Sequence, residues 1–437
     1  MRDLTSTSIQ PSLVRVMGRF SLTAAIVNGV IGSGIFGLPS AVAALTGAWS
    51  PIAVLVAGAC VFIVLLCFAE VGSRFDDAGG PYLYARDAFG AVVGFGVGWL
   101  LLVSRLLGCA AALNILVVYL GVLIPVVTTS TGRTATMAIA MGIVTAINVT
   151  GVRTASWTMN AFTVAKLLPL VLLIALGVPQ IRGEVFTTQA VAEPNWREAI
   201  LLMVFAYGGF ESMVIAASET RNPRRDTAYA LITAAAIVTL LYFLLQLVIV
   251  GVLPEAGRVT TPVAFALREL LGPSGATLGS AAVVLSVYGW LTGFTLMMPR
   301  LLYSMARHRE LPAALGRVHA RFRTPYVAII ANAVVALAMS LYSSFAEAAT
   351  FAAIARLVVF AVTCATLIRL RNTHGPSPGF RLPGGQIVAI AGVTFAVWLL
   401  STRSVRQLGI LAGIVAAGAA LRAAKGVHFR TGARQDT

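Results

Sequence analysis

The chain has 437 residues, is 58% hydrophobic and only 11% charged, and has a mean hydropathy of +0.88, which excludes a soluble globular protein. The formal net charge of +16 is compatible with nucleic-acid binding, but most of the 32 Lys and Arg residues fall in loops and tails that lie on one side of the membrane if the N-terminus is cytoplasmic. This bias is the positive-inside pattern. We therefore expect an all-α polytopic membrane protein with no nucleic-acid partner, whose basic loops orient it and contact anionic lipid headgroups.

Segments long enough to cross a membrane follow one another along the whole chain. A hydrocarbon core of roughly 30 Å needs about 20 apolar residues. Residues 1–21 lack an apolar signal-peptide core and are expected to form a cytoplasmic segment, and residues 423–437 a basic, disordered cytoplasmic tail. Twelve predicted spans lie between them, at 22–45, 50–72, 91–122, 134–150, 156–178, 198–218, 229–252, 276–304, 325–342, 347–369, 386–402 and 405–422.

The first span contains a glycine-rich interruption, NGVIGSGIFGLP over residues 28–39. Glycine inside a helix costs about 1 kcal/mol relative to alanine, and unpaired backbone groups are costly in lipid. Such a break persists where it faces protein or a water-filled cavity, so we expect its free amides and carbonyls to hold a ligand. A glycine-rich packing face or a simple kink is the alternative.

The middle of the chain combines a second interruption with buried charges. After the second span, residues 76–86 contain Gly-Gly-Pro and are expected to form a loop. Arg105, Lys166 and Arg356 lie within predicted spans and need internal partners. The sixth span is interrupted by FAYGGFE over residues 205–211, and paired Gly-interrupted spans indicate a transporter binding site. Residues 260–271 are expected to form a short outer amphipathic helix.

Four motifs in this order resemble the amino acid-polyamine-organocation transporters of the leucine-transporter-type fold. They are GVIGSGIF at 29–36, GGPY at 79–82, FAYGGFE at 205–211, and Glu219 followed by Asn222-Pro223. Ala228 departs from the family pattern, in which many members carry proline. The resemblance implies twelve transmembrane helices in a 5+5 inverted repeat, formed by 22–178 and 198–372, with 386–422 peripheral. It also implies a midplane substrate site between spans one and six, flanked by spans three, eight and ten.

The chemistry of the two breaks suits an amino acid. The amides of Ser33, Gly34 and Ile35 open a half-helix whose positive end favours a carboxylate. The free carbonyls of Ile31, Ala206 and Tyr207 suit an ammonium group. The resemblance adds Phe205 as an aromatic residue that closes over substrate. The predicted substrate-binding residues are Ile31, Gly32, Ser33, Gly34, Ile35, Phe205, Ala206, Tyr207, Gly208, Trp290 and Phe294; the aromatic ones are alternatively packing residues.

Two residues are predicted to couple transport to protons. Lys166 lies roughly 15 Å into its span, too deep for its amine to reach water, and lysine changes charge when buried more readily than arginine. The resemblance implies that its amine replaces a sodium ion beside the first break. Glu211 is the second candidate, as a proton sensor or gate. The alternatives are a static ion pair for Lys166, and for Glu211 a partner in Arg105 or a tyrosine hydroxyl.

The sequence thus predicts a secondary active transporter of amino acids, with proton-coupled uptake as the leading mechanism and exchange of amino acids or amines as the alternative. The sequence shows neither a metal-ligand set nor a nucleophile motif, so we expect no enzyme and no cofactor other than the coupling proton. The pocket residues favour a neutral or apolar substrate, without sodium dependence. The expected location is the cell membrane, with both termini cytoplasmic; the sequence gives no oligomeric state.

Overall fold

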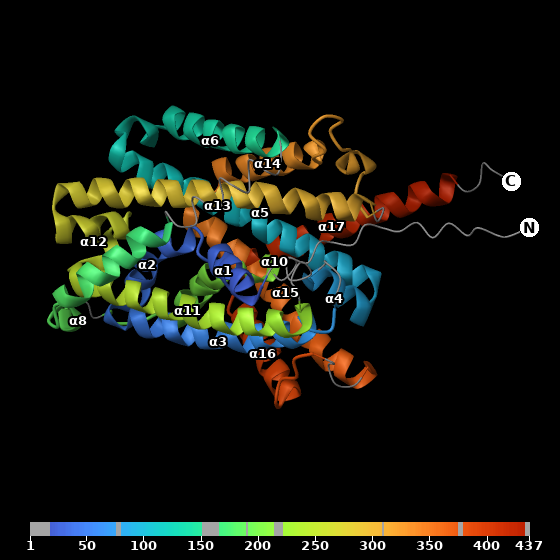
Figure 1. Ribbon diagram of the computed structural model, residues 1–437, viewed down its shortest axis with the longest axis horizontal. Helices are drawn as coiled ribbons and strands as arrows, with labels where there is room; N and C mark the ends of the chain where they lie inside the picture. The colour runs from blue at the N-terminus through green and yellow to red at the C-terminus, as the bar shows by residue number, and fades with distance from the viewer. Residues whose placement is uncertain are drawn as a thin grey trace, which may run out of the picture.

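A computed structural model describes residues 18–75, 80–150, 166–188, 191–213, 222–307, 310–374 and 379–432, and this part of the chain is helical without strands. The longest helices run along the long axis of the molecule (Figure 1). The α-helices are α1 Arg19–Val30, α2 Gly34–Thr46, α3 Ser50–Gly72, α4 Gly80–Phe89, α5 Ala91–Leu123, α6 Ser130–Thr150, α8 Val185–Thr188, α9 Trp196–Tyr207, α10 Phe210–Met213, α11 Pro223–Val252, α12 Pro262–Leu271, α13 Pro273–Arg307, α14 Tyr326–Tyr342, α15 Phe345–His374, α16 Gly385–Ser401 and α17 Val405–Gly432.

Seven helical runs of the described residues are long and apolar enough to cross a membrane, one of them combining α2 and α3. Three shorter apolar helices accompany them, Lys166–Gln180, α14 and α16. These runs establish a multi-pass helical membrane protein. The count of twelve spans and the 5+5 repeat stay predictions, because residues 151–165 and 214–221, in or beside the predicted fifth and sixth spans, lie outside the described residues.

The helix pairs that position the centre of the bundle come from distant parts of the chain. α2 packs against α9, α1 against α11, and α15 against α5. α3 contacts α9, α11 and α15. The two predicted interruptions therefore lie inside a shell of long helices, where protein rather than lipid surrounds their backbone.

Two expectations at the helix ends need correction. Residues 80–89 form a helix rather than continuing the expected loop, because Gly80 adopts a positive φ of 54° and Pro81 suits a first helical turn. The helix α17 continues to Gly432, past the predicted end at residue 422, since its alanine-rich sequence favours helix. The amphipathic helix expected over 260–271 is present as α12.

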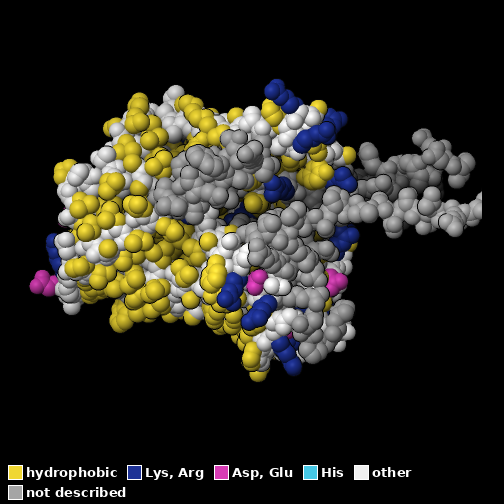
Figure 2. Space-filling model, in the orientation of Figure 1, with side chains coloured by type: hydrophobic (Ala, Val, Ile, Leu, Met, Phe, Trp, Pro, Cys, Tyr) yellow, Lys and Arg dark blue, Asp and Glu magenta, His cyan; other side chains and the backbone are white. Residues whose placement is uncertain are grey.

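The surface of the molecule separates apolar sides from a charged end. Figure 2 shows hydrophobic side chains over the flank of the bundle and Lys and Arg gathered toward the end where α4 lies. This end, formed by α4, the start of α11 and the loop between α13 and α14, is called the basic end below. The distribution follows the pattern of a membrane protein with one basic face.

Candidate functional site

The first break is an unwound segment between α1 and α2. The first hydrogen bonds of α2 run from the amides of Phe36 and Gly37 to the Ser33 carbonyl, both at 3.2 Å. The amides of Gly34 and Ile35 therefore lie outside the intrahelical ladder, at the positive end of the helix dipole. Ser33 is buried and makes no side-chain cap. Backbone amides free at a helix N-terminus are a geometry that suits an anion.

The second break separates α9 from α10 and touches the first. Gly209 has φ of +135°, which favours glycine, and an added Cβ there would lie 2.4 Å from the Gly29 carbonyl oxygen. An added Cβ on Gly34 would lie 2.9 Å from the Ala206 Cα. Gly208 is the remaining link between the two half-helices. Glycine is therefore required at these positions because the two unwound backbones approach each other directly.

Lys166 connects the neighbouring apolar helix to the first break. Its side chain is 2% exposed, and its Nζ donates to the carbonyl oxygens of Asn28, at 2.5 Å, and Ile31, at 2.9 Å. The amine thus replaces hydrogen bonds that the unwound helix has lost. Both recorded partners are carbonyls, so the described residues do not show the ion pair considered as an alternative for Lys166.

Glu211 lies in an ion cluster with two arginines beneath the second break. Its Oε1 is 2.9 Å from Arg356 Nε and 3.9 Å from an Arg105 guanidinium nitrogen. Its Oε2 accepts from the Gly209 amide at 2.8 Å, and Arg105 donates to the Gly209 carbonyl at 2.8 Å. All three charged side chains are buried. The partner proposed for Glu211, Arg105, is present, but Arg356 makes the closer contact.

Arg356 also satisfies the end of α9. Its Nη1 donates to the carbonyls of Val204 and Phe205, at 3.2 and 3.1 Å. These carbonyls belong to the last turn of α9, where the dipole favours a cation. The Phe205 carbonyl also accepts from the Gly208 amide at 3.2 Å. Gly208 leaves room for this guanidinium, since an added Cβ would lie 1.8 Å from Arg356 Nη1. The cluster therefore fixes the backbone of the second break.

Aromatic side chains from three segments form a wall beside the two breaks. The rings of Trp290 and Phe294 stack at 5.6 Å, and Phe205 meets Phe345 edge to face at 6.3 Å. An added Cβ on Gly108 of α5 would lie within 4 Å of both Trp290 and Phe205. An added Cβ on Gly32 would lie 3.0 Å from Trp290 Nε1. The structure thus brings Phe205, Trp290 and Phe294 of the predicted aromatic residues together beside the first break.

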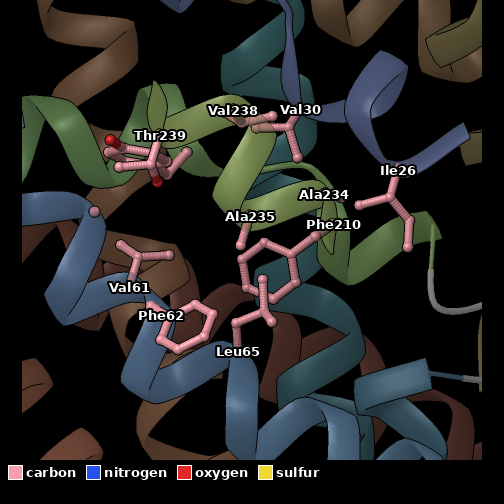
Figure 3. A pocket seen from close by; sticks show the side chains of 12 residues that line it. Ile26, Val30, Val61, Phe62, Leu65, Phe210, Ala234, Ala235, Val238 and Thr239 are labelled. Atoms are coloured by element: carbon pink, nitrogen blue, oxygen red, sulfur yellow. The ribbon is translucent and has the colours of Figure 1, made fainter. Parts of the chain in front are cut away.

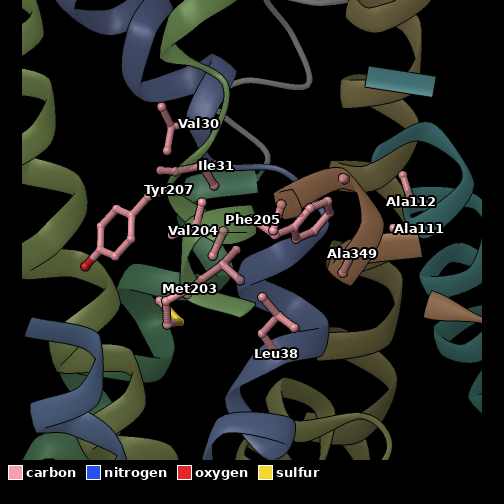
Figure 4. Packing of buried hydrophobic residues seen from close by; sticks show 14 of the residues in the cluster. Val30, Ile31, Leu38, Ala111, Ala112, Met203, Val204, Phe205, Tyr207 and Ala349 are labelled. Atoms are coloured by element: carbon pink, nitrogen blue, oxygen red, sulfur yellow. The ribbon is translucent and has the colours of Figure 1, made fainter. Parts of the chain in front are cut away.

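Tyr207 is placed differently from the other predicted residues. Figure 4 shows its side chain directed to the opposite side of α9 from that of Phe205. Its hydroxyl donates to the Val54 carbonyl at 3.0 Å, and its ring lies 5.3 Å from that of Tyr242. Only the backbone of Tyr207 can therefore face a substrate between the breaks.

Tyr242 of α11 is a bridging residue that sequence reasoning missed. Its buried hydroxyl lies 3.3 Å from the Val30 carbonyl and 3.2 Å from the Ala206 carbonyl, one in each break. A tyrosine hydroxyl inside a membrane protein needs a polar partner, but this signal does not say which one. The Ala206 and Ile31 carbonyls, both predicted for an ammonium group, thus already accept hydrogen bonds from Tyr242 and Lys166.

A small cavity lies behind the breaks, between α1, α3, α10 and α11 (Figure 3). Its volume is about 20 Å³, enough for about one water. Its lining is mostly apolar and includes Ile26, Val61, Phe210 and Val238. It is too small for an amino acid and lies on the far side of Tyr207 from the aromatic wall, so we do not assign it to substrate.

Comparison with known proteins places this geometry in a family. The amino acid permease family matches residues 17–415, and the chain belongs to it. The serine/threonine exchanger SteT of Bacillus subtilis is 29% identical, over 86% of this chain and 89% of the relative. The methylthioribose transporter of Bacillus subtilis is 26% identical, over 92% and 91%. The human large neutral amino acids transporter small subunit 2 is 29% identical, over 82% and 70%. The family is one of transporters and not of enzymes.

Proposed function

We propose that this chain is a secondary active transporter that takes up an amino acid together with a proton by alternating access. The observation that carries the proposal is the buried Lys166 amine, hydrogen-bonded to two carbonyls of the first break. A protonated amine holds these carbonyls through charge-assisted hydrogen bonds, and loss of the proton weakens both of them. Such a contact links the proton to the backbone that binds substrate.

The substrate site of this proposal is the space beside the two breaks and the aromatic wall. The free amides of Gly34 and Ile35 bind the carboxylate, with Ser33 at the same helix end. The backbone of Gly208 and Tyr207 and the carbonyls of Ile31 and Ala206 border the ammonium group. When substrate enters, the Ile31 and Ala206 carbonyls exchange their hydrogen bonds with Lys166 and Tyr242 for hydrogen bonds with the ammonium group. Phe205 closes over it.

Glu211 has a different part in this proposal. Its carboxylate contacts Arg356 and the Gly209 amide, which supports a positioning role at the second break over a proton gate. A Glu211→Gln variant separates the two, since a positioning role leaves the pH profile of uptake unshifted while lowering the rate. A shifted pH profile would return Glu211 to the proton path.

The remaining parts of the proposal concern orientation and architecture. The basic end supports a location in the cell membrane, with α4 and both termini on the cytoplasmic side. Two inverted five-helix repeats, 22–178 and 198–372, place α4 and α12 at opposite ends of the bundle, as Figure 1 draws them. Lipids surround the apolar flank.

The proposal is tested with the full-length protein in proteoliposomes. An imposed inward proton gradient should drive accumulation of a labelled amino acid, identified first with a thermal-shift panel of the twenty amino acids and common amines. Replacing sodium with choline should leave uptake unchanged. Uptake that requires sodium, or that ignores the proton gradient, contradicts proton coupling.

Exchange is the second candidate, and the similarity to a serine/threonine exchanger favours it. In an exchanger, efflux of preloaded label requires substrate outside. The same proteoliposomes distinguish the two, because a symporter accumulates substrate into empty vesicles under a proton gradient and a strict exchanger does not. Because one relative is a methylthioribose transporter, the panel of test compounds should include ligands other than amino acids.

A further inference from the structure

A second hollow lies at the basic end, away from the two breaks. It has a volume of about 610 Å³ and opens between the first turns of α11 and the segment that connects α15 to α16. Its lining combines two arginines with aromatic and aliphatic side chains. The lining residues are Arg225, Ala228, Tyr229, Ile232, Gly379, Phe380 and Arg381.

The segment on one side of this hollow is fixed to α3. The Ser73 hydroxyl is shared between the Glu70 carbonyl, at 2.8 Å, and the Phe380 carbonyl, at 3.2 Å. The Glu70 carboxylate accepts from the Leu382 amide at 2.8 Å. The bonds to Phe380 and Leu382 hold the backbone on both sides of Arg381. Arg381 therefore projects from a preorganised backbone rather than from a free loop.

The arginines of this region divide into two groups. Arg371 and Arg74 contact the Glu70 carboxylate, Arg371 with an Nε–Oε1 distance of 2.8 Å. Arg225 and Arg381 are exposed, and the described residues provide no recorded acidic partner for either. Positive charge therefore remains available at the rim of the hollow.

The start of α1 joins the same rim. Tyr229 lines the hollow, and its ring meets that of Phe20 edge to face at 6.3 Å. The guanidinium of Arg19 lies 5.0 Å from the centre of the Tyr229 ring. Tyr229 and Phe20 are 39% and 69% exposed. Exposed aromatic rings beside arginines are typical of the membrane interface.

We propose that this hollow binds an anionic phospholipid, with its phosphodiester between Arg225 and Arg381 and an acyl chain against Ile232 and Phe380. Guanidinium groups bind phosphate oxygens in a fork geometry. Arg225 begins the apolar run Arg225–Val252, so it lies at the boundary of the membrane. The apolar lining favours a lipid over free phosphate, which would leave that surface in water.

The lipid site has a consequence for α1. A phospholipid in the hollow contacts Tyr229, which packs on Phe20, so it ties the start of α1 to α11. Anionic lipid therefore stabilises the arrangement of these two helices. This inference does not rest on the proposed transport activity, and binding is measured without a substrate.

Native mass spectrometry and titration of the delipidated full-length protein with phosphatidylglycerol and phosphatidylcholine test the site. The Arg225→Gln/Arg381→Gln variant should bind phosphatidylglycerol about thirtyfold more weakly than the unmodified protein, since each arginine at the membrane surface contributes about a fivefold factor. Phosphatidylcholine binding should be weak and equal in both proteins. Should the double variant misfold, Arg381→Gln alone, outside the helices, should lower affinity about fivefold.

The matched control removes two exposed arginines from another loop of the basic end, Arg317→Gln/Arg321→Gln. This variant should bind phosphatidylglycerol as the unmodified protein does. Equal losses in both double variants would mean a diffuse charge effect and overturn the site. Equal binding of the two lipids by the unmodified protein, or displacement of bound lipid by millimolar inorganic phosphate, would overturn it too.

Discussion

The two helix breaks are similar in backbone but are held by different chemistry. The first is held by one amine, that of Lys166, which donates to the carbonyls of Asn28 and Ile31. The second is held by two guanidinium groups and a carboxylate, with Arg356 at its centre. Both arrangements replace helix hydrogen bonds that would otherwise be missing in a membrane.

The two breaks differ in whether the charge of the group that holds them can change. A lysine amine can lose its proton when buried, whereas a guanidinium group stays charged. The proposed mechanism therefore assigns the contact that changes during transport to the first break and a static role to the second. The following variants test this assignment from the strongest expected effect to the weakest.

Replacing Arg356 should have the largest effect on stability. The Arg356→Ala variant leaves Glu211 without its closest partner and removes the guanidinium donor from the Val204 and Phe205 carbonyls. Removing one member of a buried ion pair costs about 3–5 kcal/mol. We expect a large loss of folded protein, measured by size-exclusion yield and thermal unfolding in detergent.

Arg258→Ala is the control for this variant. Arg258 pairs with Glu255 at 2.8 Å, but both side chains are largely exposed. Exposed ion pairs contribute little to stability, so this variant should unfold as the unmodified protein does. An Arg356→Ala protein equally stable would show that the cluster does not hold the second break.

Gly209→Ala should abolish transport with a smaller loss of folded protein. The added Cβ would meet the Gly29 carbonyl oxygen at 2.4 Å, so the two breaks must separate. Gly272→Ala is the matched control, because Gly272 also has positive φ, +73°, but open space around its Cβ position. Backbone strain alone costs of order 1–3 kcal/mol. If the two variants transport equally well, direct contact between the breaks is not needed for function.

Lys166 variants should change the response to pH while the protein remains folded. Lys166→Arg keeps a charge that cannot be removed, so accumulation driven by a proton gradient should be lost while binding, followed by thermal shift, persists. Lys166→Ala should also lose driven accumulation. Uptake by Lys166→Arg with a normal proton dependence would exclude proton exchange at this residue.

The sequence predicts the breaks well because their cause is local. The glycines at 29–37 and 208–209 cannot continue a helix at low cost. The structure is unwound at 31–33, between α1 and α2, and at 208–209, between α9 and α10. The burial of Lys166 follows in the same way from its depth in an apolar run. That its amine faces the first break was expected only through the family resemblance, since the two segments are far apart in the chain.

The partners of the second break could not be read from the sequence. Arg356 and Glu211 are separated by 145 positions, and a buried charge requires a partner without naming it. Arg105 was the candidate partner for Glu211, yet its guanidinium lies 3.9 Å from that carboxylate and 2.8 Å from the Gly209 carbonyl oxygen. The direction of the Tyr207 side chain, by contrast, is a local property. Two residues apart on one helix, Phe205 and Tyr207 lie about 200° apart around its axis, so both cannot face the substrate.

Tyr242→Phe should have the smallest effect and tests the link between the breaks. The variant keeps the ring that packs on Tyr207 and removes the hydroxyl near the Val30 and Ala206 carbonyls. A hydrogen bond of this kind contributes about 1 kcal/mol, so a modest fall in thermal stability is expected.

Tyr119→Phe is the control variant. It removes a buried hydroxyl from the Phe36 carbonyl, outside the second break, and should cost similar stability. Only Tyr242→Phe should also alter substrate affinity, because its hydroxyl competes with the substrate ammonium for the Ala206 carbonyl; equal affinities in the two variants would assign Tyr242 to packing alone.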